Sequence, residues 1–205
     1  MTPPTSPSGH LVLLRHGETE WSKSGQHTGR TDLPLTEHGE ELARAAGALL
    51  HDFTFVETLS SPLQRARRTA ELAGLHPEVD EDLLEWDYGG YEGLTTAQIR
   101  ERLGHEWTVF ADGVVPGETP GETVEEVAAR ASRVLARIMP ALAEGDVALV
   151  GHGHCLRVLT ATWLRQEPRM GAQIILDAGS VSVLQYEREQ PCIRTWNRLP
   201  VLPTD

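Results

Sequence analysis

Two histidines follow apolar segments of the chain, and a glycine comes directly after each of them. His16 ends the run LVLLRH over residues 11–16, and His152 ends the run DVALVGH over residues 146–152. Short apolar runs predict buried strands, and the carboxyl ends of parallel strands in an open α/β sheet form the edge where ligands bind. Glycine has no Cβ, so Gly17 and Gly153 let an anion approach the backbone N–H groups. We therefore expect both histidines to share one site at this edge.

Two arginines and a glutamate complete a set that suits the cleavage of a phosphate ester. The phosphoryl group in transfer carries negative charge on its oxygens, and the guanidinium groups of Arg15 and Arg65 match its geometry. A protonated His152 adds a further donor, and an unprotonated nitrogen of His16 can attack phosphorus to form a phosphohistidine. The leaving alkoxide needs a proton, and a carboxylic acid such as Glu85 can give it.

The residue types alone leave the identity of this acid open. Glu81, Asp82, Asp87 and Glu92 lie in the same aromatic and glycine-rich segment as Glu85, and their spacing does not distinguish them. Each candidate also has an ordinary structural explanation, such as a solvated arginine on a helix or a hydrogen-bonded histidine at a strand end. The joint pattern, rather than any single residue, favours a catalytic site.

The elements expected around these residues alternate between strands and helices. Strands are predicted at residues 10–14, 53–59, 147–150, 181–186 and 192–196, the last two as an edge pair. Helices are predicted at residues 36–50, with Thr36 as the N-cap, and at residues 62–74, 95–103, 122–143 and 155–165. Residues 17–35, 81–93 and 104–121 are expected to be loops or irregular. This alternation predicts an α/β fold, a three-layer α/β/α sandwich with a mainly parallel central sheet.

The composition limits the classes of partner. The chain has 205 residues and a formal charge of −12, and 40% of its residues are hydrophobic. We expect a disordered tail over residues 1–9 and a single domain over residues 10–205. The acidic balance argues against a nucleic-acid partner, and the apolar runs are too short for a membrane span. The widely separated Cys155 and Cys192 require no disulfide, which favours a reducing, cytoplasmic location.

The motifs also resemble a known family. RHGETEWS, TGRTDLPLTEHG, SSPLQRARRTA, LLEWDYGGYEGLT, GET and GHGHCLR occur in the order and spacing of the histidine phosphatase superfamily, in its phosphoglycerate mutase-like branch. The resemblance extends from residue 10 to about residue 165. The stretch WSKSGQHTGRTDLPLT is most similar to bacterial acid phosphatases and to fungal members of the sedoheptulose-bisphosphatase type.

This resemblance implies a phosphoglycerate mutase-like fold and a set of roles. His16 is the implied phosphorylated nucleophile and Glu85 the implied proton donor, while the phosphate pocket consists of Arg15, Arg65 and His152. The residues implied to contact substrate, besides those of the phosphate pocket, are Ser22, Thr28, Gly29, Trp86, Tyr88 and Gly153. Mutases of the family usually carry asparagine at the position of Ser22, and many relatives carry a small residue at that of His154, so the resemblance assigns neither a role.

We predict hydrolysis of a small phosphorylated metabolite, without a cofactor or metal ion and with a pH optimum on the acidic side of neutral. A mutase must exclude water, and the mutases resembled here carry a longer, basic insertion between the acid and the second histidine. Here the irregular part, HEWTVFADGVVPGETPGE, is acidic and contains no lysine or arginine. The alternatives are cofactor-dependent phosphoglycerate mutase-type transfer, a sugar bisphosphatase and, more remotely, a non-catalytic module that binds phosphorylated ligands.

Three further possibilities complete the expectations. A metal hydrolase built on His152 and His154 is disfavoured, because Arg15 and Arg65 would repel the cation. A Cys155–His152 nucleophile is disfavoured as well, because Cys155 is expected inside a helix. The C-terminal strands offer an edge that could pair in a homodimer.

Overall fold

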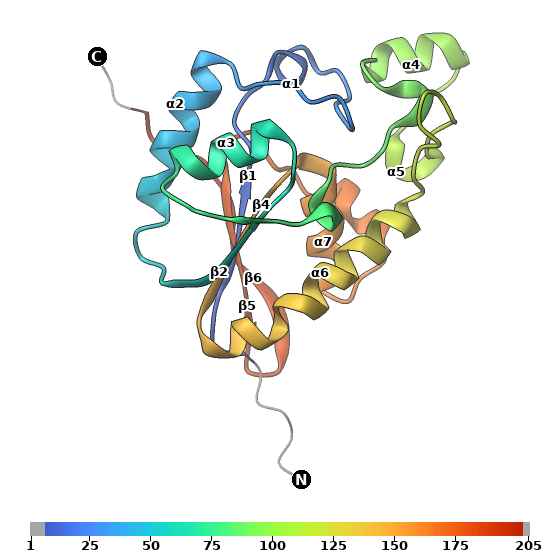
Figure 1. The fold of residues 1–205 in the computed structure, drawn as a ribbon. Helices are drawn as coiled ribbons and strands as arrows, with labels where there is room; N and C mark the ends of the chain where they lie inside the picture. The colour runs from blue at the N-terminus through green and yellow to red at the C-terminus, as the bar shows by residue number, and fades with distance from the viewer. Residues whose placement is uncertain (1–6, 203–205) are drawn as a thin grey trace.

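A single six-stranded sheet organises the protein, whose computed structural model describes residues 7–202. The strand order is β3-β2-β4-β1-β5-β6. The parallel part consists of β1 (Leu11–Arg15), β2 (Phe55–Ser60), β3 (Glu78–Val79) and β4 (Asp146–Gly151), and β5 (Val181–Glu187) and β6 (Gln190–Arg198) add antiparallel pairs. Helices cover both faces of the sheet (Figure 1). The predicted α/β/α sandwich with a mainly parallel sheet is confirmed.

The predicted strands are right in kind and differ at their ends by a few residues. The predicted edge pair is found, because β5 pairs with β6, which ends the sheet, and with β1 on its other side. β3 was not predicted at all, since its two residues, Glu78 and Val79, are both exposed and carry no apolar pattern.

One face of the sheet carries α2 (Glu37–Ala46), a 3-10 turn (Gly47–Leu49) and α3 (Gln64–Leu72). The Thr36 hydroxyl accepts a hydrogen bond from the Gly39 N–H at 3.0 Å, which confirms the predicted N-cap. Pro62 lies before the N-cap of α3, not in its first turn as predicted. The helix begins later because the Asp32 carboxylate, from another loop, accepts the Gln64 N–H at 2.8 Å.

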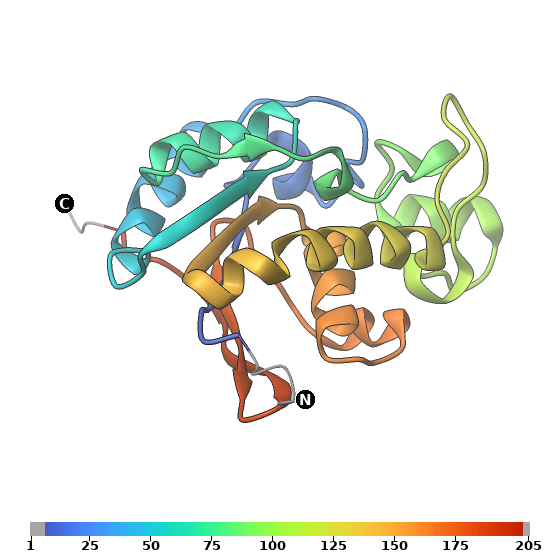
Figure 2. The same cartoon turned by 60° about the horizontal axis from the view of Figure 1, so that its bottom comes forward.

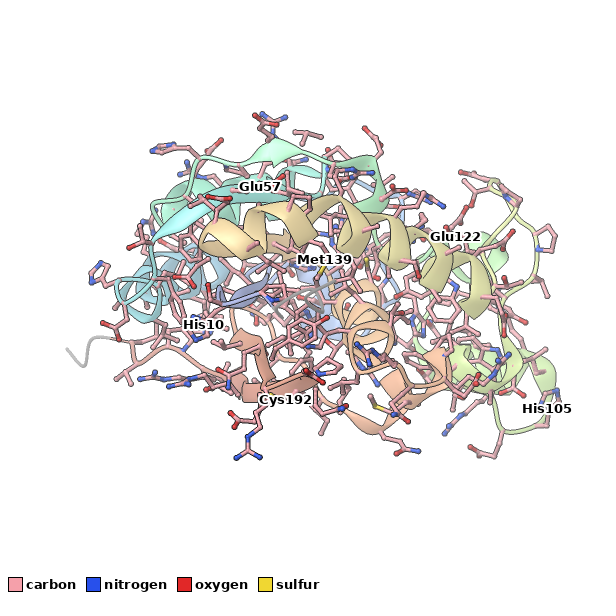
Figure 3. The ribbon with its side chains drawn as sticks, turned by 90° about the horizontal axis from the view of Figure 1, so that it is seen from below. His10, Glu57, His105, Glu122, Met139 and Cys192 are labelled. Carbon is pink, nitrogen blue, oxygen red and sulfur yellow. The ribbon has the colours of Figure 1, made fainter. Side chains whose placement is uncertain are left out.

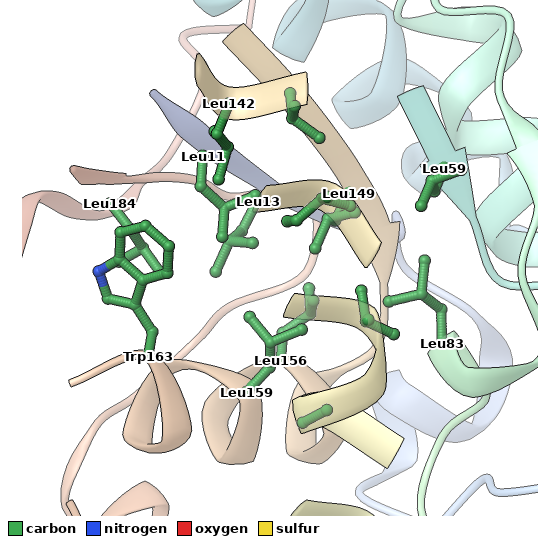
Figure 4. Close-up of a cluster of buried hydrophobic side chains, with 14 of the residues drawn as sticks. Leu11, Leu13, Leu59, Leu83, Leu142, Leu149, Leu156, Leu159, Trp163 and Leu184 are labelled. Atoms are coloured by element: carbon green, nitrogen blue, oxygen red, sulfur yellow. The ribbon is translucent and has the colours of Figure 1, made fainter. Parts of the chain in front are cut away.

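The other face carries α6 (Val124–Glu144) and α7 (Gly153–Trp163). Side chains of β1 alternate between the two cores: Leu11 and Leu13 pack with α6 and α7, as Figure 4 shows, whereas Val12 and Leu14 pack with α2 and α3. Because both faces of the sheet are buried, its inner strands read as continuous apolar runs rather than as alternating patterns.

Short helices occupy segments that the sequence suggested were loops. They are α1 (Glu20–Ser24), α5 (Val109–Asp112) and 3-10 turns over Glu81–Leu83 and Gly89–Tyr91. A further 3-10 segment, Pro168–Gln173, lies where no element was predicted from the sequence. Figures 1 and 2 show α5 beside the predicted helix α4 (Thr96–Leu103), away from the sheet at one end of the molecule. A third apolar cluster, rich in aromatic side chains, fills this end and includes Trp86, Tyr88, Trp107 and Phe110.

The start of the domain and the helices bear on two further expectations. Residues 1–6 of the predicted tail lie outside the described residues, but ordered contacts begin inside that tail, at Gly9, whose N–H donates to the Leu142 carbonyl at 3.0 Å. Among the helices described within residues 7–202, none combines the length and the apolar character needed to cross a membrane.

The topology places a ligand site between β1 and β4. The connection that leaves β1 runs to α2 on one face, while β4 leads into α7 on the opposite face. Adjacent strands whose connections diverge in this way leave a crevice at their carboxyl ends. The register pairs Arg15 with Gly151, so the next residues, His16 and His152, lie side by side at that crevice.

Candidate active site

Three strand ends converge at this crevice. The His16 N–H donates to the Gly151 carbonyl, and the Ser61 N–H, just past β2, donates to the Val150 carbonyl, each at 3.0 Å. The imidazole rings of His16 and His152 lie 5.1 Å apart between centroids, and both are buried. The expectation that the two strand–histidine–glycine segments meet is therefore confirmed by the geometry.

His16 is held with one ring nitrogen unprotonated. Its Nδ1 lies 2.7 Å from the Gly17 carbonyl oxygen, which only accepts hydrogen bonds, so Nδ1 carries the hydrogen and Nε2 keeps a free lone pair. Burial, followed by the charges of Arg65 and Arg15, lowers the pKa of His16 well below its ordinary value. The side chain is thus a neutral imidazole.

His152 uses both of its ring nitrogens. Arg65 Nε donates to His152 Nδ1 at 3.1 Å, so the ring hydrogen sits on Nε2, which donates to the Ser61 hydroxyl at 2.7 Å. Burial and, next, the charge of Arg65 lower the pKa of His152 well below its ordinary value. The protonated His152 expected from the sequence is therefore wrong for the free protein: a buried imidazole beside a guanidinium stays neutral.

Arg65 is fully buried and braces a loop. Its Nη1 donates to the Thr31 carbonyl at 2.8 Å, and its Nη2 donates to the carbonyls of Gly29, at 3.0 Å, and of Thr28. Because these donors and Nε are engaged, Arg65 fixes the orientation of His152 and the shape of the loop from behind the cavity.

Arg15 lies against the start of α7. Its Nη1 donates to the Leu176 carbonyl, while its Nε is buried without a hydrogen-bond partner among the described residues. A Cβ at Gly153 would lie 3.3 Å from Arg15 Cζ, so the lack of a side chain at this glycine leaves room for the guanidinium. An unpaired buried donor of this kind is suited to an anion that arrives with the substrate.

Gly17 serves packing instead of anion binding. Its N–H donates to the Thr69 hydroxyl at 3.0 Å, and a Cβ there would overlap the carbonyl group of Gly39. The sequence-based expectation that its N–H faces an anion is therefore wrong. Gly17 is required for the close approach of the β1 loop to α2.

Glu85 is buried and held by backbone N–H groups. Its Oε1 accepts from the N–H groups of Trp86 and Cys155, both at 2.8 Å, and its Oε2 accepts from the N–H of His154 at 3.0 Å. Since each carboxylate oxygen has two lone pairs, Oε2 retains one that can carry a proton. Glu85 lines the same cavity as His16.

The competing carboxylates have other contacts. Asp82 forms ion pairs with Arg133 and Arg137, and the Asp87 carboxylate accepts from the Gly89 N–H. Glu92 accepts the Gly29 N–H with both of its oxygens, at 2.9 and 3.0 Å. Glu81 is exposed and does not line the cavity. These observations favour Glu85 over the other acids of the segment.

A buried ion pair that the sequence analysis missed holds the Glu85 segment in place. Arg130 Nε donates to Glu122 Oε1 at 2.7 Å, and Arg130 Nη1 donates to the carbonyls of Asp82, at 2.7 Å, and Leu84, at 3.0 Å. The Glu122 carbonyl accepts from Trp86 Nε1 at 2.7 Å. Figure 3 labels Glu122 at the N-terminal end of α6. The only sign of this ion pair in the sequence was the GET motif that contains Glu122, and that motif did not predict a contact with Arg130.

The cavity itself has a volume of about 180 Å³. Of the predicted site residues, it is lined by Arg15, His16, Ser22, Thr28, Glu85, Tyr88 and Gly153. Arg65, His152, Trp86 and Gly29 are buried and do not line it. The lining residues that the sequence analysis did not assign to the site are Gly25, Gln26, His27, His154, Arg157 and Leu176.

The outer wall of the cavity is built from neutral aromatic groups. Burial lowers the pKa of His27 to about 4 and lowers that of His154 well below its ordinary value, whereas burial raises the pKa of Tyr88. The Tyr88 hydroxyl and His154 Nδ1 form a hydrogen bond of 2.6 Å. Ser22 contributes mainly structure, because its hydroxyl donates to the Thr19 carbonyl in the cap of α1.

Other groups that could act in catalysis are placed differently. Burial raises the pKa of the Cys155 thiol to about 12, so this group is not a thiolate nucleophile. Cys192 lies on β6 (Figure 3), and both cysteines are free. Within residues 7–202, no group of three or more metal-binding side chains is arranged around a common point.

The family model of the histidine phosphatase superfamily (branch 1) matches residues 11–199. This chain belongs to that superfamily. It is a phosphatase that acts on phosphorylated metabolites. The family assignment from the sequence motifs is confirmed.

Relatives and a solved structure agree with this assignment. An acid phosphatase of Mycobacterium tuberculosis is 39% identical over 180 residues, which cover 86% of each protein. A sedoheptulose 1,7-bisphosphatase of Saccharomyces cerevisiae is 37% identical over 183 residues, which cover 74% of this chain and 66% of the relative. The solved structure of an open reading frame of Mycobacterium tuberculosis superposes with a TM-score of 0.87 at 36% identity, covering 94% of this chain and 98% of the other.

Proposed function

We propose that this phosphatase hydrolyses a small phosphomonoester through a phosphohistidine on His16. The observation that carries the proposal is the hydrogen bond from His16 Nδ1 to the Gly17 carbonyl, which leaves Nε2 unprotonated at the cavity. A neutral imidazole with a fixed orientation is the form that can attack phosphorus.

In the first half-reaction, His16 Nε2 forms a bond to phosphorus while the bond from phosphorus to the ester oxygen breaks. The leaving oxygen takes the proton from Glu85 Oε2, the oxygen with a free lone pair. Arg15, whose buried Nε lacks a partner among residues 7–202, offsets the negative charge on the phosphoryl oxygens.

In the second half-reaction, water attacks phosphorus and gives a proton to the Glu85 carboxylate. The bond from phosphorus to Nε2 breaks, inorganic phosphate leaves, and both side chains regain their starting protonation states. In the free protein, neutral His152 donates its Nε2 hydrogen to the Ser61 hydroxyl. Rotation of His152 and Ser61 toward the phosphoryl group would let this N–H donate to a phosphoryl oxygen, without a net charge on the imidazole.

The experiment that tests the proposal compares phosphate release by the wild type and by His16→Ala. His105→Ala is a matched control, because His105 is exposed and does not line the cavity. We expect the wild type and the control to release phosphate from p-nitrophenyl phosphate without added 2,3-bisphosphoglycerate, and His16→Ala to release almost none. Equal activity of His16→Ala and wild type would contradict the mechanism.

The proposal also includes the absence of a metal cofactor, a cytoplasmic location and pairing as a homodimer through the β6 edge. The two free cysteines support a reducing compartment. Full activity after dialysis against EDTA is the expected result, and loss of activity that zinc or magnesium restores would overturn the metal-independent assignment.

A further inference from the structure

The arginines of this acidic protein that are not solvent-exposed fall into two groups, those that pair with a carboxylate and those that do not. Arg30 and Arg130 pair with Glu122, and Arg100 pairs with Glu106. The remaining three have no carboxylate within 4.0 Å in the described part of the chain, and all three belong to the candidate active site: Arg15, Arg65 and Arg157. A half-buried guanidinium without a counter-ion is costly unless an anion is bound in the functional state.

Arg157 is held in a defined position on α7. Its Nε donates to the Gly171 carbonyl at 2.7 Å, and its guanidinium carbon lies 4.9 Å from the centre of the Phe110 ring. A Cβ at Gly171 would lie 2.9 Å from that ring, so the 3-10 segment and α5 enclose the arginine tightly. The stem is therefore fixed, while Nη1 and Nη2 make no hydrogen bond to any residue in the range 7–202.

Arg157 lines the cavity that also holds His16 and Glu85. Burial lowers the pKa of Arg157, while the charge of Glu85 acts in the opposite direction, so the two side chains share one electrostatic environment. His154 lines the same cavity, and its Nδ1 is hydrogen-bonded to the Tyr88 hydroxyl. The guanidinium of Arg157 thus remains as a donor beyond those that the phosphoryl transfer uses.

We propose that Arg157 binds a second anionic group of the substrate, a carboxylate or a second phosphate, while the scissile phosphoryl group lies at His16 and Arg15. The preferred substrates are then metabolites that carry an additional anion next to the phosphomonoester. A planar guanidinium recognises both kinds of oxyanion through paired N–H donors. The inference rests on the proposed phosphatase mechanism and specifies its substrate class.

The experiment uses matched substrates that differ in the second anion. 3-Phosphoglycerate and glycerol 3-phosphate differ in a carboxylate, and fructose 1,6-bisphosphate and fructose 1-phosphate differ in a second phosphate. kcat and KM are measured for the wild type, Arg157→Gln and Arg157→Lys. Arg165→Gln is the control, since Arg165 is an exposed arginine just beyond α7.

Loss of a charge-assisted hydrogen bond should lower kcat/KM of Arg157→Gln by about 10- to 100-fold on the substrate with the second anion, mainly through KM. The matched substrate without it should change by less than about 3-fold, and Arg157→Lys should recover part of the preference. The pair that shows this selective loss identifies the anion as carboxylate or phosphate.

Two outcomes would overturn the assignment. Equal losses on both members of each pair would mean that Arg157 serves the shared phosphoryl group or the fold. Unchanged kinetics on every substrate would mean that it binds no part of the substrate. Hydrolysis of p-nitrophenyl phosphate, which has no second anion, separates this result from failure of the phosphatase mechanism: the mechanism fails if wild type and His16→Ala do not differ on that substrate.

Discussion

The carboxyl ends of β1 and β4 have the same sequence pattern and opposite hydrogen bonding. At the end of β1, His16 donates from Nδ1 to the adjacent Gly17 carbonyl and keeps Nε2 free. At the end of β4, His152 accepts from Arg65 at Nδ1 and donates to Ser61 from Nε2. The pattern of an apolar run, a histidine and a glycine thus gives the location of both residues, but the neighbouring donors and acceptors decide which one can be a nucleophile.

The two glycines differ in the same way. Gly17 packs against the backbone of α2 and donates its N–H to the Thr69 hydroxyl, and these contacts fix the loop that orients His16. Gly153 leaves space for Arg15 and begins α7, whose following N–H groups hold Glu85. In the proposed mechanism the β1 end therefore supplies the nucleophile, and the β4 end supplies the setting for the phosphate and the acid.

The largest expected effect separates the two histidines. His16→Ala should lower kcat on p-nitrophenyl phosphate by at least about 10⁴-fold, because the covalent route is lost. His152→Ala should lose about 10²- to 10³-fold, as expected for removal of one donor near the phosphoryl group. Steady-state kinetics of both variants test this contrast. If both variants were equally inactive and neither could be phosphorylated, the contrast between the two histidines would be contradicted.

The acid held at the start of α7 should show its role through the leaving group. Glu85→Gln should lower kcat by about 10²- to 10⁴-fold on an alkyl phosphate, since its alkoxide leaves only with a proton. The loss on p-nitrophenyl phosphate should be much smaller, because nitrophenolate leaves without one. Glu92→Gln is the matched control from the same segment, and equal losses on both substrates would contradict the role of Glu85.

The ends of β1 and β4 and the outer wall of the cavity all contain neutral, buried histidines. The free energy of unfolding therefore depends on pH. Burial lowers the pKa of His27 from 6.5 to about 4, so the unfolded chain binds more protons in this interval. Stability is then fully present above pH 6.5 and decreases as the pH falls toward 4. The contribution of His27 is about 3 kcal/mol over that window, from 1.36 kcal/mol per pKa unit.

Urea unfolding at pH 7 and pH 4.5 measures this dependence. His27→Gln should lose less free energy of unfolding on acidification than the wild type, by about 2–3 kcal/mol. The exposed His105→Gln should behave as the wild type. The same pH dependence in His27→Gln as in the wild type would show that this side chain is not a buried neutral base.

The smallest expected effect concerns the group that holds His152. Ser61→Ala removes the acceptor of the Nε2 hydrogen, which should destabilise the fold by about 1–3 kcal/mol and lower kcat by about 10-fold through misplacement of the ring. Ser132→Ala, on the exposed side of α6, is the control. A change in kcat as large as that of His16→Ala would mean that the β4 end does more than position and donate.

The sequence could predict the strands that carry the site because parallel strands buried on both faces leave a continuous apolar run, as in residues 11–14. It could also predict the cap of α2, since Thr36 acts within three residues along the chain. It could not predict β3, whose two residues are exposed, or the start of α3, which depends on Asp32 from a distant loop.

Within the candidate site, the motif resemblance named residues that the structure brings together at the crevice but not their protonation. The neutral state of His152 depends on burial and on Arg65, which are properties of the folded structure. Arg130 and Glu122 meet only when α6 packs against the Glu85 segment, and Arg157 reaches the cavity only because Gly171 and Phe110 enclose it. Contacts of this kind leave no local pattern in the sequence.

The central claim is that the β1 histidine, not the β4 histidine, carries the phosphoryl group. The most direct measurement mixes the wild-type protein with excess p-nitrophenyl phosphate, denatures it at alkaline pH, where the phosphorus–nitrogen bond survives, and maps the modified peptide by mass spectrometry. The account predicts one phosphoryl group on the peptide that contains His16, and none in His16→Ala. A phosphoryl group on the peptide that contains His152, or continued turnover without any phosphopeptide, would contradict it.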